Sequence, residues 1–143
     1  MADITNVNEL SVADSLKYDA DTGDVFTTAW ANYGDTSTIV GWATFTEKHI
    51  YLKKVGKLVF CSFYLRGESN SEDVSFTIPY ISTNYYFING VSANLDAGEL
   101  YLGSVRNLDG IVNVHKQLAN GAFANSGTKE CCGSFWFEAG TIV

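Results

Sequence analysis

The feature that most constrains the fold is the alternation of apolar and polar residues, with a period of two, in several short segments. Residues 74–78 (VSFTI) alternate apolar and hydroxyl side chains, and Pro79, the only proline of the chain, follows directly. A half-buried β-strand requires this period, because successive side chains point to opposite faces. Proline has no N–H for a neighbouring strand, so we expect a strand that ends at Pro79.

The most apolar of these segments spans residues 57–66. Gly56 separates it from residues 48–55, which alternate in the same way. Large apolar side chains occupy both faces of residues 57–66, which predicts a central strand covered on two sides, or one whose outer face meets another subunit. The predicted core comprises Val59, Cys61, Phe63, Leu65, Val74, Phe76 and Ile78.

Further segments of strand composition lie along the whole chain, at residues 24–29, 38–45, 85–91, 99–105, 110–115, 134–137 and 141–143. Glycines punctuate the chain, and Asn89-Gly90, Asp109-Gly110 and Asn120-Gly121 favour turns with positive φ. About eight or nine short strands predict an all-β fold, an antiparallel β-sandwich or jelly roll. Residues 8–17 are the one segment with a helical alternative.

Size and composition indicate one folded domain with a short N-terminal lead-in. The chain has 143 residues, of which 46% are hydrophobic and 14% aromatic, and a disordered chain is far less apolar. The first residues are richer in Asp, Thr and Asn than the rest. We therefore expect residues 1–35 to form a stem or attachment segment and residues 36–143 to form the β-sandwich head.

The charge balance disfavours nucleic acid as a partner. The 9 Lys and Arg residues face 16 Asp and Glu residues, giving a net charge of −7, which repels phosphate backbones. No apolar run has the length of a membrane span, so we expect no membrane insertion. The N-terminus lacks the basic start and apolar core of a signal peptide, which predicts synthesis in the cytoplasm without export.

Metal-binding and catalytic patterns are absent from the sequence. The acidic residues 19–24 lack the ligand spacing of a calcium loop, so a turn explains them better. Cys61, Cys131 and Cys132 are odd in number and have no zinc spacing, which favours free thiols over a strained vicinal disulfide. His49 and Cys61 could be neighbours across a hairpin, but burial would suppress the reactivity of this thiol. We expect no metal, no cofactor and no enzymatic activity.

Aromatic residues are the candidates for binding. Alternation lets only one side of each aromatic run enter the core, and rings that point outward stack on sugars or anchor subunit interfaces. The candidate ligand-binding residues, for which core or interface positions are the alternative, are Trp30, Tyr33, Tyr85, Tyr86 and Trp136. The candidate oligomer interface, on the second face of the central strand, comprises Leu58, Phe60 and Tyr64.

Residues 37–42 (STIVGW), followed by residues 49–60 (HIYLKKVGKLVF), resemble a pattern in phage tail-fibre and virion-decoration proteins. In that pattern a Gly-Trp strand precedes a hairpin with Tyr, Lys, Gly and Val, and a later strand ends in proline, as at Pro79. The resemblance covers residues 37–80. It implies a homotrimeric β-structured module that projects from a virion and binds a host-surface glycan or protein.

The resemblance leads to a hypothesis about function. We expect a non-enzymatic virion component, a fibre-head or adhesin module, whose N-terminal segment contacts other virion proteins. The alternative is a structural capsid or tail decoration protein without a host ligand. A small carbohydrate-active enzyme ranks lowest, because no acid/base pair stands in a recognisable setting.

Overall fold

The computed structural model describes residues 18–19, 24–25, 30–82, 89–119 and 121–142. Every regular element in these ranges is a β-strand, which confirms the predicted all-β class. None of the described residues belongs to a helix long and apolar enough to cross a membrane. The predicted helical alternative at residues 8–17 lies outside the described residues.

The described strands are β1 (Tyr18–Asp19), β2 (Asp24–Val25), β3 (Ala31–Asn32), β4 (Ile39–Val40), β5 (Trp42–Val55), β6 (Leu58–Ser69), β7 (Ser75–Thr77), β8 (Tyr80–Ser82), β9 (Gly90–Asp96), β10 (Glu99–Leu108), β11 (Ile111–His115) and β12 (Thr128–Ile142). β1 and β2 pair with each other, across the acidic segment for which a turn was predicted. The other strands form one antiparallel sheet in the order β3-β5-β6-β12-β9-β10-β11-β7-β4, and β8 pairs with β12.

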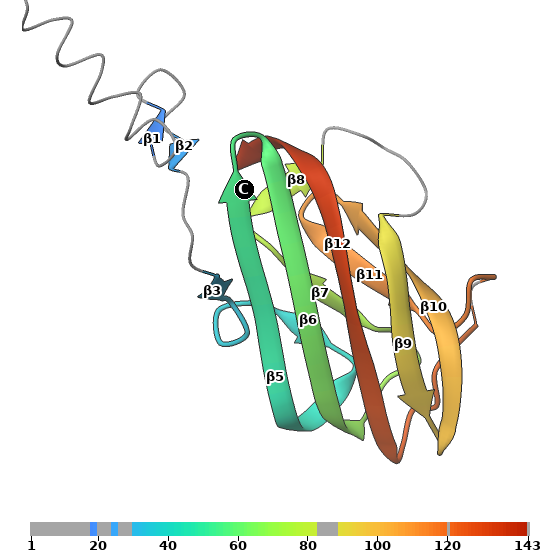
Figure 1. Ribbon diagram of the computed structural model, residues 1–143. Coiled ribbons are helices and arrows are strands. Elements are labelled where there is room, and N and C mark those ends of the chain that lie inside the picture. Colours follow the sequence, from blue (N-terminus) through green and yellow to red (C-terminus); the bar gives the residue numbers. More distant parts are fainter. Residues whose placement is uncertain (1–17, 20–23, 26–29, 83–88, 120, 143) are drawn as a thin grey trace, which may run out of the picture.

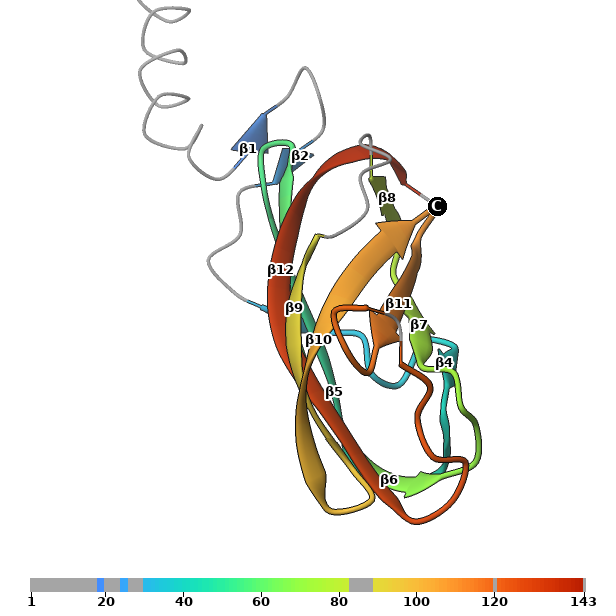
Figure 2. The ribbon, with the colours of Figure 1, turned by 90° about the vertical axis from the view of Figure 1, so that its right-hand side faces the viewer.

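This sheet folds over into two layers. The front layer contains β5, β6, β12 and β9 (Figure 1), and β11, β7 and β4 lie behind it (Figure 2). β10 passes from one layer to the other, because its first part pairs with β9 and its second part with β11. The two layers fit the predicted antiparallel sandwich, whereas a jelly-roll topology stays a prediction.

The core lies between the two layers and confirms the predicted register. All seven residues predicted to be buried have at most 4% of their surface exposed. β6 lies between β5 and β12, so it is the central strand that its two apolar faces predicted. Phe63 of the front layer contacts Phe76 of the back layer, with ring centroids 5.2 Å apart. Burying each such side chain contributes about 1.5–3 kcal/mol to stability.

The predicted strand at residues 38–45 is wrong as a single element. It is divided at Gly41, whose φ of 127° favours glycine and turns the chain from β4 in the back layer to β5 in the front. Trp42 follows this corner, is buried, and donates a hydrogen bond from Nε1 to the backbone oxygen of Lys129 at 3.1 Å. β5 then continues to Val55 and absorbs the segment at residues 48–55.

The predicted ends of the later strands also need correction. β12 begins at Thr128 rather than at residue 134 and includes residues 141–142, which were expected to form a separate edge. The predicted turn at Asn89-Gly90 does not form, because Gly90 belongs to β9 and lies opposite Phe135. A Cβ atom at Gly90 would stand 2.6 Å from the Cβ of Phe135, so this glycine permits close approach rather than a turn. Asp109-Gly110 does turn with positive φ at both residues, as predicted.

The lead-in is only partly described. β3 pairs with β5 and already belongs to the large sheet, although it lies within the predicted residues 1–35. The domain boundary at residue 35 stays a prediction.

Candidate functional site

The front layer has a broad face that points away from the core, here called the outward face. It consists of the residues of β5, β6, β12, β9 and β10 that alternate with the buried ones, together with Trp30 just before β3. Two regions of it differ in chemistry. The aromatic stripe consists of Trp30, Tyr51, Phe60, Tyr64 and Trp136, and the aliphatic patch consists of Val91, Ala93, Leu95, Leu100 and Leu102.

The aromatic stripe crosses β5, β6 and β12. Trp136 is directly opposite Phe60 in the β6–β12 pairing, and 60% of its surface is exposed. On the other side of β6, His49 stacks on Tyr64 with ring centroids 6.5 Å apart and on Tyr51 at 5.9 Å. The stripe therefore presents several rings on a rigid sheet, an arrangement suited to flat apolar ligands.

One end of the stripe is slightly hollowed. Trp30, Tyr51 and Ser62 line a shallow cavity of about 420 Å³, and Trp30 is exposed beside it. Trp30 precedes β3, whose Ala31 pairs with Leu52 of β5, and this pairing brings the indole close to Tyr51. The cavity combines two aromatic rings with a hydroxyl group, which could contact the apolar and polar sides of one sugar ring.

Of the five candidate ligand residues, the three that the structure describes do not share one site. Trp30 and Trp136 are exposed on the outward face, whereas Tyr33 is half-buried and packs against the core. The backbone N–H of Tyr33 donates to Ile50 and its carbonyl accepts from the turn that follows, so Tyr33 has a structural role there. Tyr85 and Tyr86 lie outside the described residues.

The predicted interface residues lie on the same face as Trp136. Leu58 is exposed, and Phe60 and Tyr64 are half-buried by their neighbours on the sheet. Because Phe60 pairs directly with Trp136, the predicted interface and the predicted ligand site share one surface.

The sequence-based prediction missed the aliphatic patch. Leu100 is 75% exposed and Leu102 58%, and Val91 is also largely open to solvent. Leu100 pairs with Leu95, and Leu102 pairs with Ala93. Apolar and polar residues alternate strictly at residues 91–96, which is the pattern of a strand. This strand was not predicted, because a turn was expected at Asn89-Gly90.

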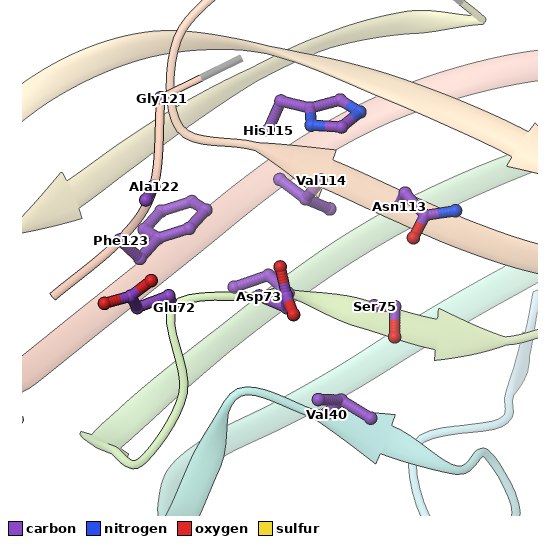
Figure 3. Close-up of a pocket in the computed structure, with 11 residues that line it drawn as sticks. Val40, Glu72, Asp73, Ser75, Asn113, Val114, His115, Gly121, Ala122 and Phe123 are labelled. Atoms are coloured by element: carbon purple, nitrogen blue, oxygen red, sulfur yellow. The ribbon is translucent and has the colours of Figure 1, made fainter. Parts of the chain in front are cut away.

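A second hollow lies on the back layer (Figure 3). It has a volume of about 540 Å³ and is lined by polar groups of β7, β11 and the adjoining loops, among them Glu72, Asp73, Asn113 and His115. Burial, with a smaller contribution from Arg106, lowers the pKa of His115. The hollow can offer hydrogen bonds to a polar ligand. Among the described residues, no group of three His, Cys, Asp or Glu side chains could hold a metal ion.

The three thiols are free and differ in exposure. Cys61 and Cys131 are buried, and burial raises the pKa of both thiols, whereas Cys132 is half-buried on the outward face. The side chain of Cys61 faces the core, while His49 is on the opposite face of the β5–β6 hairpin. These two residues therefore do not form a nucleophile and base pair.

Comparison with known proteins finds no match, whether with protein-family models, curated proteins or solved structures.

Proposed function

We propose that the protein is a non-enzymatic binding module of a virion, of the fibre-head or adhesin type. It works as a homotrimer and recognises a host-surface glycan or protein through the outward face. The observation that carries the proposal is the end of the aromatic stripe where the exposed Trp30 and Tyr51 line a shallow cavity. The resemblance of residues 37–80 to tail-fibre and decoration proteins supports the same function.

The physical basis is the rigidity of the stripe. Hydrogen bonds of β5 and β12 to the central β6 hold the rings in place, so a ligand does not have to order them. Indole and phenol rings stack on the C–H faces of sugars and also anchor protein partners. Ser62 and Ser134, whose hydroxyl groups lie 3.3 Å apart, lie between the rings and can supply hydrogen bonds to hydroxyl groups of a ligand.

A glycan array and a binding assay on intact host cells test this function. We expect specific binding by the wild type and at least a tenfold loss in Trp30→Ala and in Tyr51→Ala. The matched control is Leu118→Ala, which removes an exposed apolar side chain from the turn after β11. Unchanged binding by both of these variants would contradict the role of the aromatic stripe.

The second candidate function is a structural decoration protein without a host ligand. The aliphatic patch favours it, because exposed leucines suit packing against protein better than binding a glycan. A protein that assembles but binds neither glycans nor cells would support this alternative.

A further inference from the structure

The β9–β10 hairpin has an inverted pattern of polarity. The core-facing residues of β9, which are Ser92, Asn94 and Asp96, are polar and almost completely buried. The outward residues of the hairpin, the aliphatic patch, are apolar and mostly exposed. A sheet with one face in water normally shows the opposite arrangement, with apolar residues inside and polar residues outside.

Specific hydrogen bonds fix this inversion. The Asp96 carboxylate accepts the backbone N–H of Ala124 at 2.9 Å and lies 2.8 Å from the Lys116 ammonium. Asn94 Nδ2 donates to the backbone oxygens of His115 and Lys116, both at 3.1 Å. A shift of the register by one residue would break all of these contacts, so the leucines cannot turn inward.

We infer that a second copy of this chain covers the aliphatic patch. The inference rests on the proposed function for its biological role, since it names the partner surface of the assembled module. In a monomer, Leu100 and Leu102 would be 75% and 58% exposed to water on the outward side of β10, which is unfavourable in free energy. A subunit contact would bury both side chains.

Charge favours a copy of the same chain over another partner. Two chains that each carry −7 approach most easily where neither presents a charge, and all five residues of the aliphatic patch are uncharged. The nearest charges on the adjoining strands, Arg66 and Glu130, are 3.6 Å apart and offset each other. A basic or acidic partner would find no opposite charge within the patch.

The available area fits such a contact. With strands about 4.8 Å apart and a rise of about 3.3 Å per residue, β6, β12, β9 and β10 present about 600 Å² of outward surface. Stable contacts bury about 600–1,000 Å² per partner. The contact therefore extends from the aliphatic patch across β12 and takes in Trp136 and Phe60, while the cavity at Trp30 stays outside it.

Light scattering on the purified full chain tests the inference with one variant and one control. Leu102→Glu places a charge in the aliphatic patch. Leu118→Glu makes the same change in net charge at a leucine of similar exposure, 53%, in the turn after β11. We expect the wild type and Leu118→Glu to have a multiple of 15.6 kDa at about 50 μM, and Leu102→Glu to have the monomer mass with an unchanged far-UV spectrum.

A monomeric wild type at this concentration would overturn the inference, and so would a folded Leu102→Glu that keeps the assembled mass. Monomers that still bind cells or glycans would overturn the inference and the proposed homotrimer, but would leave the proposed ligand recognition intact. Assemblies that bind neither cells nor glycans would support the inference. They would contradict the proposed ligand recognition and favour a decoration protein.

A measurement on the wild type alone keeps the inference testable if Leu102→Glu does not fold. Cys132 pairs with Ala93, which pairs with Leu102, so this thiol lies inside the proposed contact. We expect a bulky maleimide to label Cys132 at least tenfold more slowly at 100 μM protein than at 0.1 μM. A rate constant independent of protein concentration would overturn the inference.

Discussion

Asp96 and Lys116 form an ion pair across 2.8 Å, although only 1% of the Asp96 surface is exposed. Asp96 ends β9 and Lys116 directly follows β11, so this pair ties the front layer to the back layer. The hydrogen bond to Asp96 raises the pKa of Lys116.

The first prediction follows from this pair. Asp96→Asn leaves the Lys116 ammonium without its carboxylate, and removing one partner of a buried ion pair destabilises the folded protein. Lys116 retains some contact with water, so we expect a loss of about 2–3 kcal/mol in the free energy of unfolding, measured by urea denaturation. Asp109→Asn, at an exposed turn residue with φ of 53°, is the control and should change stability by less than about 0.5 kcal/mol. Equal losses in both variants would contradict the role of the pair.

The second prediction concerns pH and the buried Lys129. Its Nζ donates to the backbone oxygen of Ser71 at 2.8 Å and lies 4.9 Å from the centre of a Trp42 ring. Burial lowers the pKa of Lys129 below its ordinary value of 10.5. Between the lowered pKa and 10.5 the unfolded chain binds more protons than the folded one, so this group makes stability rise with pH.

Lys129→Met keeps the apolar stem and removes this titration. We expect the wild type to gain stability relative to Lys129→Met as the pH rises from 7 to 10, measured by urea denaturation at each pH. The raised pKa of Lys116 is common to both proteins, and its stabilising effect is lost only above pH 10.5. A stability difference that is constant over this range would show that the pKa of Lys129 is not lowered.

The third prediction concerns Gly103, which lies opposite Ser92 in the β9–β10 hairpin. A Cβ atom there would overlap the backbone oxygen of His115 and the side-chain amide of Asn94. Backbone cannot give way as a flexible side chain does, so Gly103→Ala should cost at least about 3 kcal/mol in thermal unfolding. Gly121→Ala is the control, because its Cβ would meet only the Gln117 side chain, at 3.2 Å. A Gly103→Ala protein with wild-type stability would mean that Asn94 does not hold the hairpin in this register.

The fourth prediction concerns the thiols. At a concentration low enough to keep the chain monomeric, Ellman's reagent should react with one thiol per native chain and with three in concentrated guanidinium. Burial raises the pKa of Cys61 and Cys131 and shields both sulfur atoms, so only Cys132 can react. Cys132→Ser should abolish the native reaction. Fast reaction of two thiols would contradict the inward position of Cys131, and a lower melting temperature in reductant would reveal a disulfide.

Much of the core could be predicted because it depends on the alternation of side chains between the two faces of a single strand. In β6 and β7 the side chains alternate between faces, so Val59, Phe63 and Phe76 had to share the buried side once the segments were strands. The same parity predicted that Trp136 would point outward. Predictions that depend on the neighbouring strands were wrong. Gly90 was predicted to form a turn, but the absence of a side chain at Gly90 instead allows Phe135 to approach closely.

The all-β class and the two faces of the central strand could be predicted from single segments, because each depends only on the period of two along one strand. Which strands lie side by side depends on the complete fold, and so does the pairing of Trp136 with Phe60. The complete fold also places Asn94 and Asp96 toward the core, since their partners Lys116 and Ala124 lie twenty or more residues away along the chain. A buried polar residue is stable only if such partners reach it, and no local pattern specifies them.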